Sequence, residues 1–321
     1  MKRMLLLLTA CSSAHGNAPI DSSQATDGTH MIDGAHMIDG SHVIDGPLMT
    51  SSTIFTIVLE NHDYNEIVGS ANAPYINSQI AMGGLATNYK DTGHPSLPNY
   101  LHMISGDNQY PGGVDVAPTF FWFPAANPNL GTQLEAAGIR WRSYQESMGT
   151  PCNLSSAGSY APKHDPFVYF KDQQMGANNL CADTNVDYGS FAADLATNTY
   201  RYMWITPNLT DDGHDPSGDP VGALTTSDTW LSHNVPAILA SEGFTNGGYL
   251  FITWDEAEGR NGDDIDQIPM IVLSSHLKSA GMQVGTAYTH SSYLATVEDL
   301  LGLSRLSTVT SAASLAPDFF Q

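Results

Sequence analysis

Four short, continuous apolar runs constrain the fold of this 321-residue chain. They are rich in β-branched and aromatic residues, and they cover residues 53–59, 202–206, 249–254 and 268–273. Continuous apolar runs of this length are typical of strands that are covered on both faces of a sheet. We therefore expect four buried strands.

Amphipathic helical patterns separate these runs. They cover residues 75–82, 130–137, 191–195, 228–242 (with a kink expected at Pro236) and 291–301. Buried strands that alternate with helices predict an α/β fold, a three-layer sandwich around a mostly parallel central sheet. Composition does not change after residue 53, so we expect one domain over residues 51–321.

The N-terminus has the features of an export signal. Met1–Arg3 is charged, Met4–Leu8 is a short apolar core, and Leu8-Thr9-Ala10-Cys11 resembles a bacterial lipobox. The apolar core is too short to span a bilayer. We predict a lipoprotein signal peptide over residues 1–10 and lipidation of Cys11; the alternative is a plain secretory signal in which Cys11 is incidental.

Residues 11–50 contain a six-residue repeat that ends in His-(Met/Val)-Ile-Asp-Gly and occurs three times. Its three His and three Asp could bind a metal weakly. Three such units are too few to build a core of their own. We favour a flexible tether over a metal site.

The remaining cysteines and the net charge limit the function further. Cys152 and Cys181 are left as a pair, which predicts a disulfide in an oxidising compartment, with two free thiols as the alternative. With 11 Lys plus Arg against 33 Asp plus Glu, the formal charge is −22. This charge disfavours nucleic acid and anionic membrane surfaces as partners. An anionic substrate would need strong local positive charge, which a metal ion supplies economically.

The stretch from Thr92 to Tyr100 carries a hydroxyl, an imidazole and a carboxamide between two prolines. Each proline disfavours helical geometry in the residue before it, so we expect His94 and Leu97 to be non-helical. A helix is expected to start near Pro98, which would place Ser96 just ahead of a helix N-terminus, where an anion is favoured. The alternative is an ordinary turn in which Ser96 caps the helix.

Oxygen-bearing side chains follow two of the predicted strands. Glu60 and Asn61 come directly after the first strand, and Asp255 and Glu256 come directly after the third. Ligands of open α/β sheets gather at the carboxyl ends of the strands. An oxygen-rich set of this kind suits a hard divalent cation, although loop solvation or helix capping is the alternative for such residues.

Three histidines lie at element boundaries. His214 follows the strand at 202–206 beside Asp215, His164 follows Lys163, and His290 opens the last helix. Such residues could donate hydrogen bonds to phosphate or act as an acid. For any single histidine, a structural role is the alternative.

Six motifs in order make the sequence resemble a known family. They are Leu59-Glu60-Asn61-His62, His94-Pro95-Ser96-Leu97-Pro98-Asn99-Tyr100, Lys163-His164-Asp165-Pro166-Phe167, Pro207-Asn208 with Asp211-Asp212-Gly213-His214-Asp215, Asp255-Glu256 and Tyr288-Thr289-His290. Over residues 53–303 the chain resembles the bacterial phosphoesterase family of secreted acid phosphatases and phospholipases C, within the alkaline-phosphatase superfamily. The resemblance implies an alkaline-phosphatase-like fold. The short length is similar to that of the acid phosphatases, since the phospholipases C usually carry extra C-terminal β-domains.

The resemblance also implies roles for individual residues. Ser96 would be the nucleophile of two in-line displacements through a phosphoserine. Asn99, His164, His214 and His290 would donate to phosphoryl oxygens, and His214 and His290 would also serve in catalysis. The residues implied as ligands of a divalent metal are Glu60, Asn61, Ser96, Asp255 and Glu256.

The metal set departs from that of the two-zinc members of the superfamily, which have His and Asp around both ions. The oxygen-rich set here favours one ion, Ca²⁺ or Mg²⁺, with Mn²⁺ or Zn²⁺ as alternatives.

Three functions remain open at this stage. The first is an exported, lipid-anchored phosphomonoesterase of the cell envelope, or a secreted one, acting on a small phosphate ester. The second is a phosphodiesterase or phospholipase C that uses the same site on a phospholipid headgroup. The aromatic run 120–123 could then line an apolar groove; core packing or a covering loop is the alternative for that run. The third is a non-catalytic metal- or sugar-binding surface lipoprotein. In each, the membrane is reached through the N-terminal lipid alone.

Overall fold

The computed structural model describes residues 52–107, 114–119, 122–124, 126–175, 180–214, 218–258 and 265–321. All of them belong to the second of the two units into which the chain divides, residues 47–321. The predicted signal peptide, Cys11 and the repeat segment lie outside the described residues, as do Phe120, Phe121 and Asp215.

A nine-stranded sheet forms the centre of this unit, in the order β4-β3-β5-β1-β6-β7-β2-β8, with β9 paired to β2. Only β7 runs antiparallel to its neighbours among the described strands. In register, Ile54 of β1 lies opposite Tyr202 of β5 on one side and Tyr249 of β6 on the other. The strands are β1 Ile54–Leu59, β2 Gly84–Lys90, β3 Trp141–Gln145, β4 Asn185–Asp187, β5 Tyr202–Thr206, β6 Tyr249–Trp254, β7 Gln267–Ser274, β8 Met282–Val284 and β9 Tyr288–Thr289.

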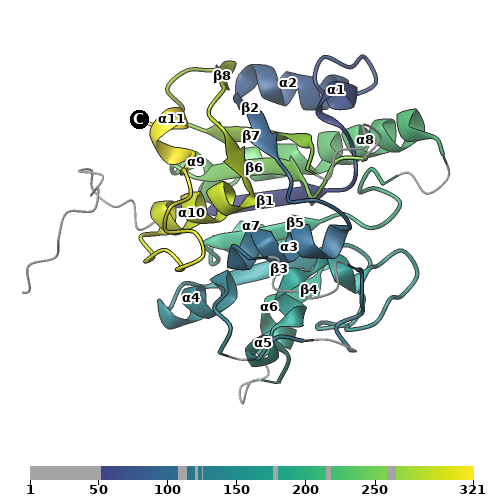
Figure 1. Cartoon of the computed structure of the whole chain (residues 1–321), viewed down its shortest axis with the longest axis vertical. Helices are drawn as coiled ribbons and strands as arrows, with labels where there is room; N and C mark the ends of the chain where they lie inside the picture. Colours follow the sequence, from purple (N-terminus) through teal and green to yellow (C-terminus); the bar gives the residue numbers. More distant parts are fainter. Residues whose placement is uncertain are drawn as a thin grey trace, which may run out of the picture. The chain divides into compact units, whose positions relative to one another are not determined.

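Helices cover both faces of the sheet. In Figure 1, α3 and α10 lie on the near side of the strands and α8 lies on the far side. Helix α3 packs against α10, and α2 packs against α8. The helices are α1 Tyr64–Ile67, α2 Pro74–Met82, α3 Ser96–Ser105, α4 Leu130–Ala136, α5 Lys171–Met175, α6 Leu180–Thr184, α7 Phe191–Thr197, α8 Pro220–Ala240, α9 Glu242–Thr245, α10 His290–Leu301 and α11 Ala316–Phe319, with 3-10 turns η1 Pro162–His164, η2 Pro166–Tyr169 and η3 Tyr188–Ser190.

The predicted α/β sandwich with a mostly parallel sheet is confirmed. All six residues of β1 are buried, as are all five of β5 and all six of β6, because helices lie on both faces of these strands. The burial of such apolar side chains contributes about 25 cal/mol per Å² of apolar surface removed from water. The four predicted strands are β1, β5, β6 and β7.

Two predictions about local structure are wrong. Leu97 is helical, because α3 begins at Ser96 and not near Pro98. A proline is tolerated in the first turn of a helix, where its missing N–H has no intrahelical partner. Helix α8 begins at Pro220, eight residues before the predicted start, and its first turn is capped by the Asp219 side chain, which accepts from Gly222 N at 3.0 Å.

Cys152 and Cys181 form the predicted disulfide, with a Cα–Cα distance of 5.3 Å. The bond links the segment after β3 to α6. Among the described residues, every helix is too short or too polar to cross a bilayer.

The aromatic run 120–123 is described only in part. Phe123 is buried and stacks on Phe170 with ring centroids 5.0 Å apart, whereas Trp122 is 40% exposed. Phe123 therefore packs in the core, and Trp122 is the described member that faces solvent.

Candidate active site

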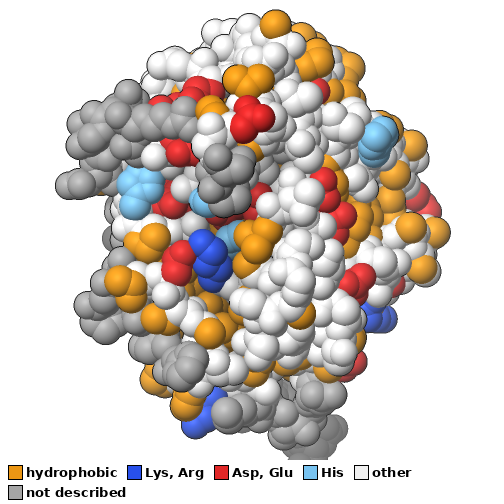
Figure 2. Space-filling model, turned by 90° about the vertical axis from the view of Figure 1, so that its right-hand side faces the viewer, with side chains coloured by type: hydrophobic (Ala, Val, Ile, Leu, Met, Phe, Trp, Pro, Cys, Tyr) orange, Lys and Arg blue, Asp and Glu red, His pale blue; other side chains and the backbone are white. Residues whose placement is uncertain are grey.

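The carboxyl ends of the parallel strands bring most of the predicted site residues to one edge of the sheet. Glu60 and Asn61 follow β1, and Asp255 and Glu256 follow β6. Helix α3 starts with Ser96 a few residues after β2, which is parallel to β1 and β6 because both β2 and β6 run antiparallel to β7. Figure 2 shows this face, where a cationic side chain lies beside acidic and histidine side chains with hydrophobic side chains around them.

Ser96 is the first residue of α3 and is only 2% exposed. The turn that leads to it needs a glycine, since Gly93 has a φ of 111°, which side chains rarely tolerate. A cis peptide bond joins His94 to Pro95. The Ser96 hydroxyl donates to Glu60 Oε2 at 3.1 Å and lies 3.4 Å from Glu256 Oε1.

The Glu256 carboxylate contacts the other polar side chains of this turn. Its Oε1 accepts from Asn61 Nδ2 at 2.9 Å, and its Oε2 accepts from Asn99 Nδ2 at 3.0 Å. His94 Nδ1 lies 3.1 Å from the same Oε2 in an ion pair. The one carboxylate thus joins the end of β1, the turn before α3 and the end of β6.

Asn99 is not free to donate in this arrangement. Its Nδ2 group also donates to the carbonyls of Gly93 and Pro95, the latter at 3.3 Å, and its Oδ1 accepts from Thr92 N at 2.9 Å. Asn99 therefore holds the turn around Ser96 in shape, and the predicted contact with substrate would require one of these bonds to be exchanged.

Several oxygens in the cluster have no hydrogen-bond partner among the described residues. They are both carboxylate oxygens of Asp255, Oε1 of Glu60, the amide oxygen of Asn61 and Oδ2 of Asp212. Buried oxygens without a partner cost free energy unless a cation or a donor satisfies them. Their chemistry fits a hard cation. As they stand, no three His, Cys, Asp or Glu side chains of the described part of the chain are arranged to hold an ion.

Crowding of acids changes their ionisation. Burial, and then the charges of Glu60 and Glu256, raise the pKa of Asp255 well above its usual value. Burial and the charge of Glu60 do the same to the pKa of Asp212. Burial also raises the pKa of Glu256, although its bond to His94 opposes this. A cation among these groups would favour their charged forms.

His164 and His214 lie on the β5 side of the cluster. His164 Nε2 is 3.1 Å from Glu60 Oε1, and its ring stacks on Tyr100 with centroids 5.1 Å apart. Burial lowers the pKa of His164 to about 4, so the ring is neutral at pH 7. His214 is half-buried, and its backbone N–H donates to Asp212 Oδ1 at 2.9 Å. Asp212 Oδ2 lies 3.8 Å from His164 Nδ1, so these two predicted donors both adjoin Asp212.

His290 has a different environment from the one expected. Its Nε2 lies 2.7 Å from the backbone carbonyl of Asp255, and its Nδ1 lies 2.9 Å from the Tyr89 hydroxyl. Burial lowers its pKa to about 3. Both nitrogens of the neutral ring have protein partners, so these contacts lend no support to the predicted bond with substrate and instead hold the strand end that carries Asp255.

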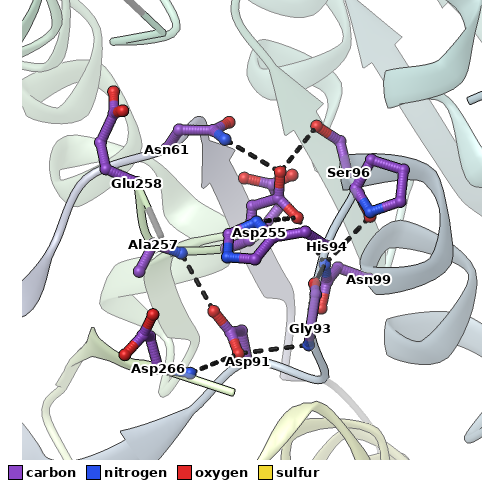
Figure 3. Close-up of polar contacts among 12 residues, drawn as sticks. Asn61, Asp91, Gly93, His94, Ser96, Asn99, Asp255, Ala257, Glu258 and Asp266 are labelled. Carbon is purple, nitrogen blue, oxygen red and sulfur yellow. Dashed lines mark hydrogen bonds and ion pairs between the residues drawn. The ribbon is translucent and has the colours of Figure 1, made fainter. Parts of the chain in front are cut away.

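Asp91 was not predicted, yet it joins three segments at the site (Figure 3). One of its oxygens accepts from Gly93 N at 3.2 Å and from Asp266 N at 2.8 Å. The other accepts from Ala257 N at 3.1 Å. Asp91 follows β2, a strand that the sequence did not indicate, so no pattern pointed to it.

Other residues at the site were also missed. The sequence showed Lys163 as a cation beside His164, but its proximity to Ser96 depends on the fold, since Nζ lies 3.3 Å from Ser96 Oγ. Asp115 binds this lysine at 2.6 Å and follows no recognisable element. His94 was visible only as part of the Ser96 stretch.

Comparisons with known proteins agree with this geometry. A phosphatidylinositol-3-phosphatase of Mycobacterium tuberculosis is 29% identical over 267 residues, which cover 83% of this chain and 82% of that protein. Acid phosphatases of Aspergillus fumigatus and Penicillium chrysogenum (the latter phosphate-repressible) are each 30% identical, over 78% and 81% of this chain. The chain spans 55% and 61% of the lengths of these two fungal relatives.

Solved structures show the same fold at low identity. A protein of the alkaline phosphatase superfamily from Vibrio parahaemolyticus has a TM-score of 0.55 at 11% identity, covering 81% of this chain and 68% of its own. A phosphonate monoester hydrolase of Agrobacterium radiobacter has a TM-score of 0.55 at 13% identity, covering 83% and 76%.

The model of the Phosphoesterase family matches residues 70–304, which is most of the chain. The predicted family is thereby confirmed, and the solved structures confirm the predicted alkaline-phosphatase-like fold. This chain belongs to the Phosphoesterase family, and acid phosphatases are among the proteins that it resembles over most of its length.

Proposed function

We propose that this protein is an exported, metal-dependent phosphomonoesterase that acts through a phosphoserine at Ser96. The observation that carries the proposal is the position of the Ser96 hydroxyl, at the start of α3 and within hydrogen-bond distance of Glu60 and Lys163. A helix N-terminus favours the anion that would form there.

The residues around Ser96 would divide the work. Ser96 Oγ attacks phosphorus and the alcohol leaves; water then attacks the phosphoserine and inorganic phosphate is released. His164 and His214 would donate to phosphoryl oxygens as negative charge moves between them. His290 would act as a positioning residue through the Asp255 carbonyl, and Asn99 would keep the turn in shape.

The oxygen-rich cluster supports the metal part of the proposal, since partnerless oxygens of Asn61 and Asp255 lie in it. One divalent ion, Ca²⁺ or Mg²⁺ in preference to Mn²⁺ or Zn²⁺, would screen the phosphate charge and lower the pKa of the serine hydroxyl. The residues that would hold it are Glu60, Asn61, Ser96, Asp255 and Glu256.

Ser96→Ala tests the mechanism directly. Turnover of p-nitrophenyl phosphate should be abolished with an unchanged melting curve, since the hydroxyl packs little of the core. Ser307→Ala is the matched control, because Ser307 is exposed after α10 and should keep full activity. Activity of Ser96→Ala within about tenfold of the parent, at an unchanged melting temperature, would remove Ser96 from the mechanism.

A lipid phosphate is the second candidate substrate. The Mycobacterium tuberculosis relative is named for a phosphoinositide, and three exposed apolar side chains lie on segments next to site residues: Val114 at 49%, Leu209 at 39% and Ile265 at 50%. Activity on a short-chain phosphatidylinositol phosphate above that on p-nitrophenyl phosphate would favour this candidate. Cleavage of bis(p-nitrophenyl) phosphate in preference to the monoester would favour a phosphodiesterase or phospholipase C.

Export and lipid anchoring form a separate part of the proposal. The Cys152–Cys181 disulfide supports an oxidising compartment. Lipidation of Cys11 predicts that the protein partitions with membranes and that Cys11→Ser releases it. A wild-type protein that is found free of membranes and carries no acyl mass would contradict the anchor.

A further inference from the structure

Lys163 is the cation that contacts the proposed nucleophile. It lies in η1, and its Nζ donates to Ser96 Oγ at 3.3 Å. Its side chain is 26% exposed, so the lysine lies at the edge of the cluster and is partly open to solvent. Among the described residues, no other Lys or Arg makes a hydrogen bond to Ser96.

Asp115 fixes the ammonium group in this position. Its Oδ2 accepts from Lys163 Nζ at 2.6 Å, while its Oδ1 accepts from the backbone N–H of Leu97 at 3.1 Å. Leu97 is the neighbour of Ser96 in the first turn of α3. The lysine is thus tied to the same helical turn that carries the nucleophile, so the two groups keep their relative position.

The negative charge around Ser96 makes a positive group necessary there. A phosphate ester approaching Ser96 meets the buried acids Glu60, Asp255 and Glu256 in a protein of formal charge −22. Without its Asp115 anchor, the ammonium group would be drawn toward these acids. Held by Asp115, it stays at the seryl oxygen, where the two displacement steps form and break the bond to phosphorus.

We propose that Lys163 is a catalytic residue that stabilises negative charge on Ser96 Oγ in both displacement steps, with Asp115 as its positioning residue. The inference rests on the phosphoserine mechanism above. In the first step Oγ gives its proton to solvent and bonds to phosphorus, and the ester oxygen leaves with its electron pair and takes a proton from water.

In the second step the same bond is broken. Water attacks phosphorus and loses a proton to solvent, the electron pair of the P–Oγ bond returns to Oγ, and Oγ regains a proton from solvent. Lys163 remains an ammonium donor to Oγ throughout. Because Oγ is the attacking group first and the leaving group second, loss of the donor slows both steps, whichever alcohol the substrate carries.

The test measures the two steps separately with p-nitrophenyl phosphate, by rapid release of nitrophenolate and by acid quench followed by intact-mass detection of the phosphoserine. Lys163→Gln should lower both the formation and the hydrolysis of the phosphoserine by about a hundredfold or more, as expected for one lost donor to a developing oxyanion. Lys163→Arg, which keeps charge and donors, should restore part of both rates.

Two further variants keep the result interpretable. Asp115→Asn keeps the lysine but weakens its anchor, so both steps should slow by about tenfold, the cost of one charge-assisted bond. Lys171→Gln removes an exposed lysine at the start of α5 and should leave both rates unchanged. If Lys163→Gln does not fold, Lys163→Arg and Asp115→Asn still decide the proposal.

The possible outcomes distinguish failure of the lysine proposal from failure of the phosphoserine mechanism. If the wild type forms a phosphoserine and Lys163→Gln forms and hydrolyses it at wild-type rates, Lys163 has no catalytic role. A slower first step with an unchanged second step also overturns the role in both steps. If the wild type never forms a phosphoserine and Ser96→Ala remains active, the mechanism itself fails and the lysine proposal fails with it.

Discussion

Removal of the metal should destabilise the protein, and Asp255→Asn should reverse part of that effect. In metal-free protein, burial and the charges of Glu60 and Glu256 raise the pKa of Asp255. A group whose pKa is raised by folding contributes stability below its unfolded pKa, and that contribution is lost as the pH rises through its folded pKa. The metal-free wild type should therefore be less stable at pH 8 than at pH 5.

The size of the effect follows from linkage. An ion at about 100 times its dissociation constant stabilises the folded state by about 2.7 kcal/mol. For a chain of this size, each kcal/mol shifts the melting temperature by about 2–4 °C, so the ion should raise it by about 5–10 °C. Asparagine cannot ionise, so metal-free Asp255→Asn should melt above metal-free wild type at pH 8, while added metal should raise its melting temperature less.

Melting curves of EDTA-treated protein, recorded by calorimetry at both pH values with and without Ca²⁺ or Mg²⁺, measure these shifts. Glu242→Gln is the charge control, because Glu242 is exposed on α9 and outside the cluster. The reasoning is refuted if metal raises the melting temperatures of wild type and Asp255→Asn equally. It is also refuted if metal-free Asp255→Asn is the less stable protein at pH 8.

Three other properties should respond as follows. Reduction of the Cys152–Cys181 bond, whose cysteines are 29 positions apart, should lower the free energy of unfolding by about 3–4 kcal/mol, measured by denaturant titration. Turnover at low temperature should stay intact. An unchanged denaturation midpoint would contradict this. Burial raises the pKa of Glu298 to about 7, so the wild type should lose about 1–3 kcal/mol of its free energy of unfolding as the pH rises through 7. Glu298→Gln should lack this loss. Identical profiles of stability against pH would show that Glu298 does not cause it. Asp91→Asn should lower kcat and lower the free energy of unfolding by about 1–3 kcal/mol, because an amide cannot accept hydrogen bonds from all three backbone N–H groups. A variant with wild-type kcat and stability would show that these bonds are dispensable.

The central strands could be predicted because they are covered on both faces. β1, β5 and β6 are fully buried, so their sequences are almost wholly apolar. β2 carries Thr87 and Asn88, which are half-buried, and Lys90, which is exposed. Its pairing with β7 on one side and with β8 and β9 on the other depends on contacts far along the chain, so its own residues give little sign of a strand.

Some residues of the candidate site could also be predicted from the sequence, and others could not. Glu60 and Asp255 could be located because each follows directly after an apolar strand, and the carboxyl ends of parallel strands meet at one edge. Asp91 also follows directly after a strand, but the sequence did not indicate β2, and Asp115 follows no strand. Both carboxylates accept hydrogen bonds from backbone N–H groups of other segments. No local pattern encodes a partner that lies in another loop.

The geometry of the site depends on residues at strand ends and on carboxylates that hold the loops. The proposed metal ligands Glu60 and Asp255 sit at strand ends, where the sheet fixes their backbone. The carboxylates of Asp91, Asp115 and Glu256 hold the surrounding loops and the first turn of α3 in place. Each of these three carboxylates joins segments far apart in the sequence, so replacing one should move several groups at once. A serine hydroxyl that must meet phosphorus within a few tenths of an ångström depends on such contacts as much as on its own side chain. Losses of activity on substituting these carboxylates should therefore be non-additive with each other, because they act on one shared geometry.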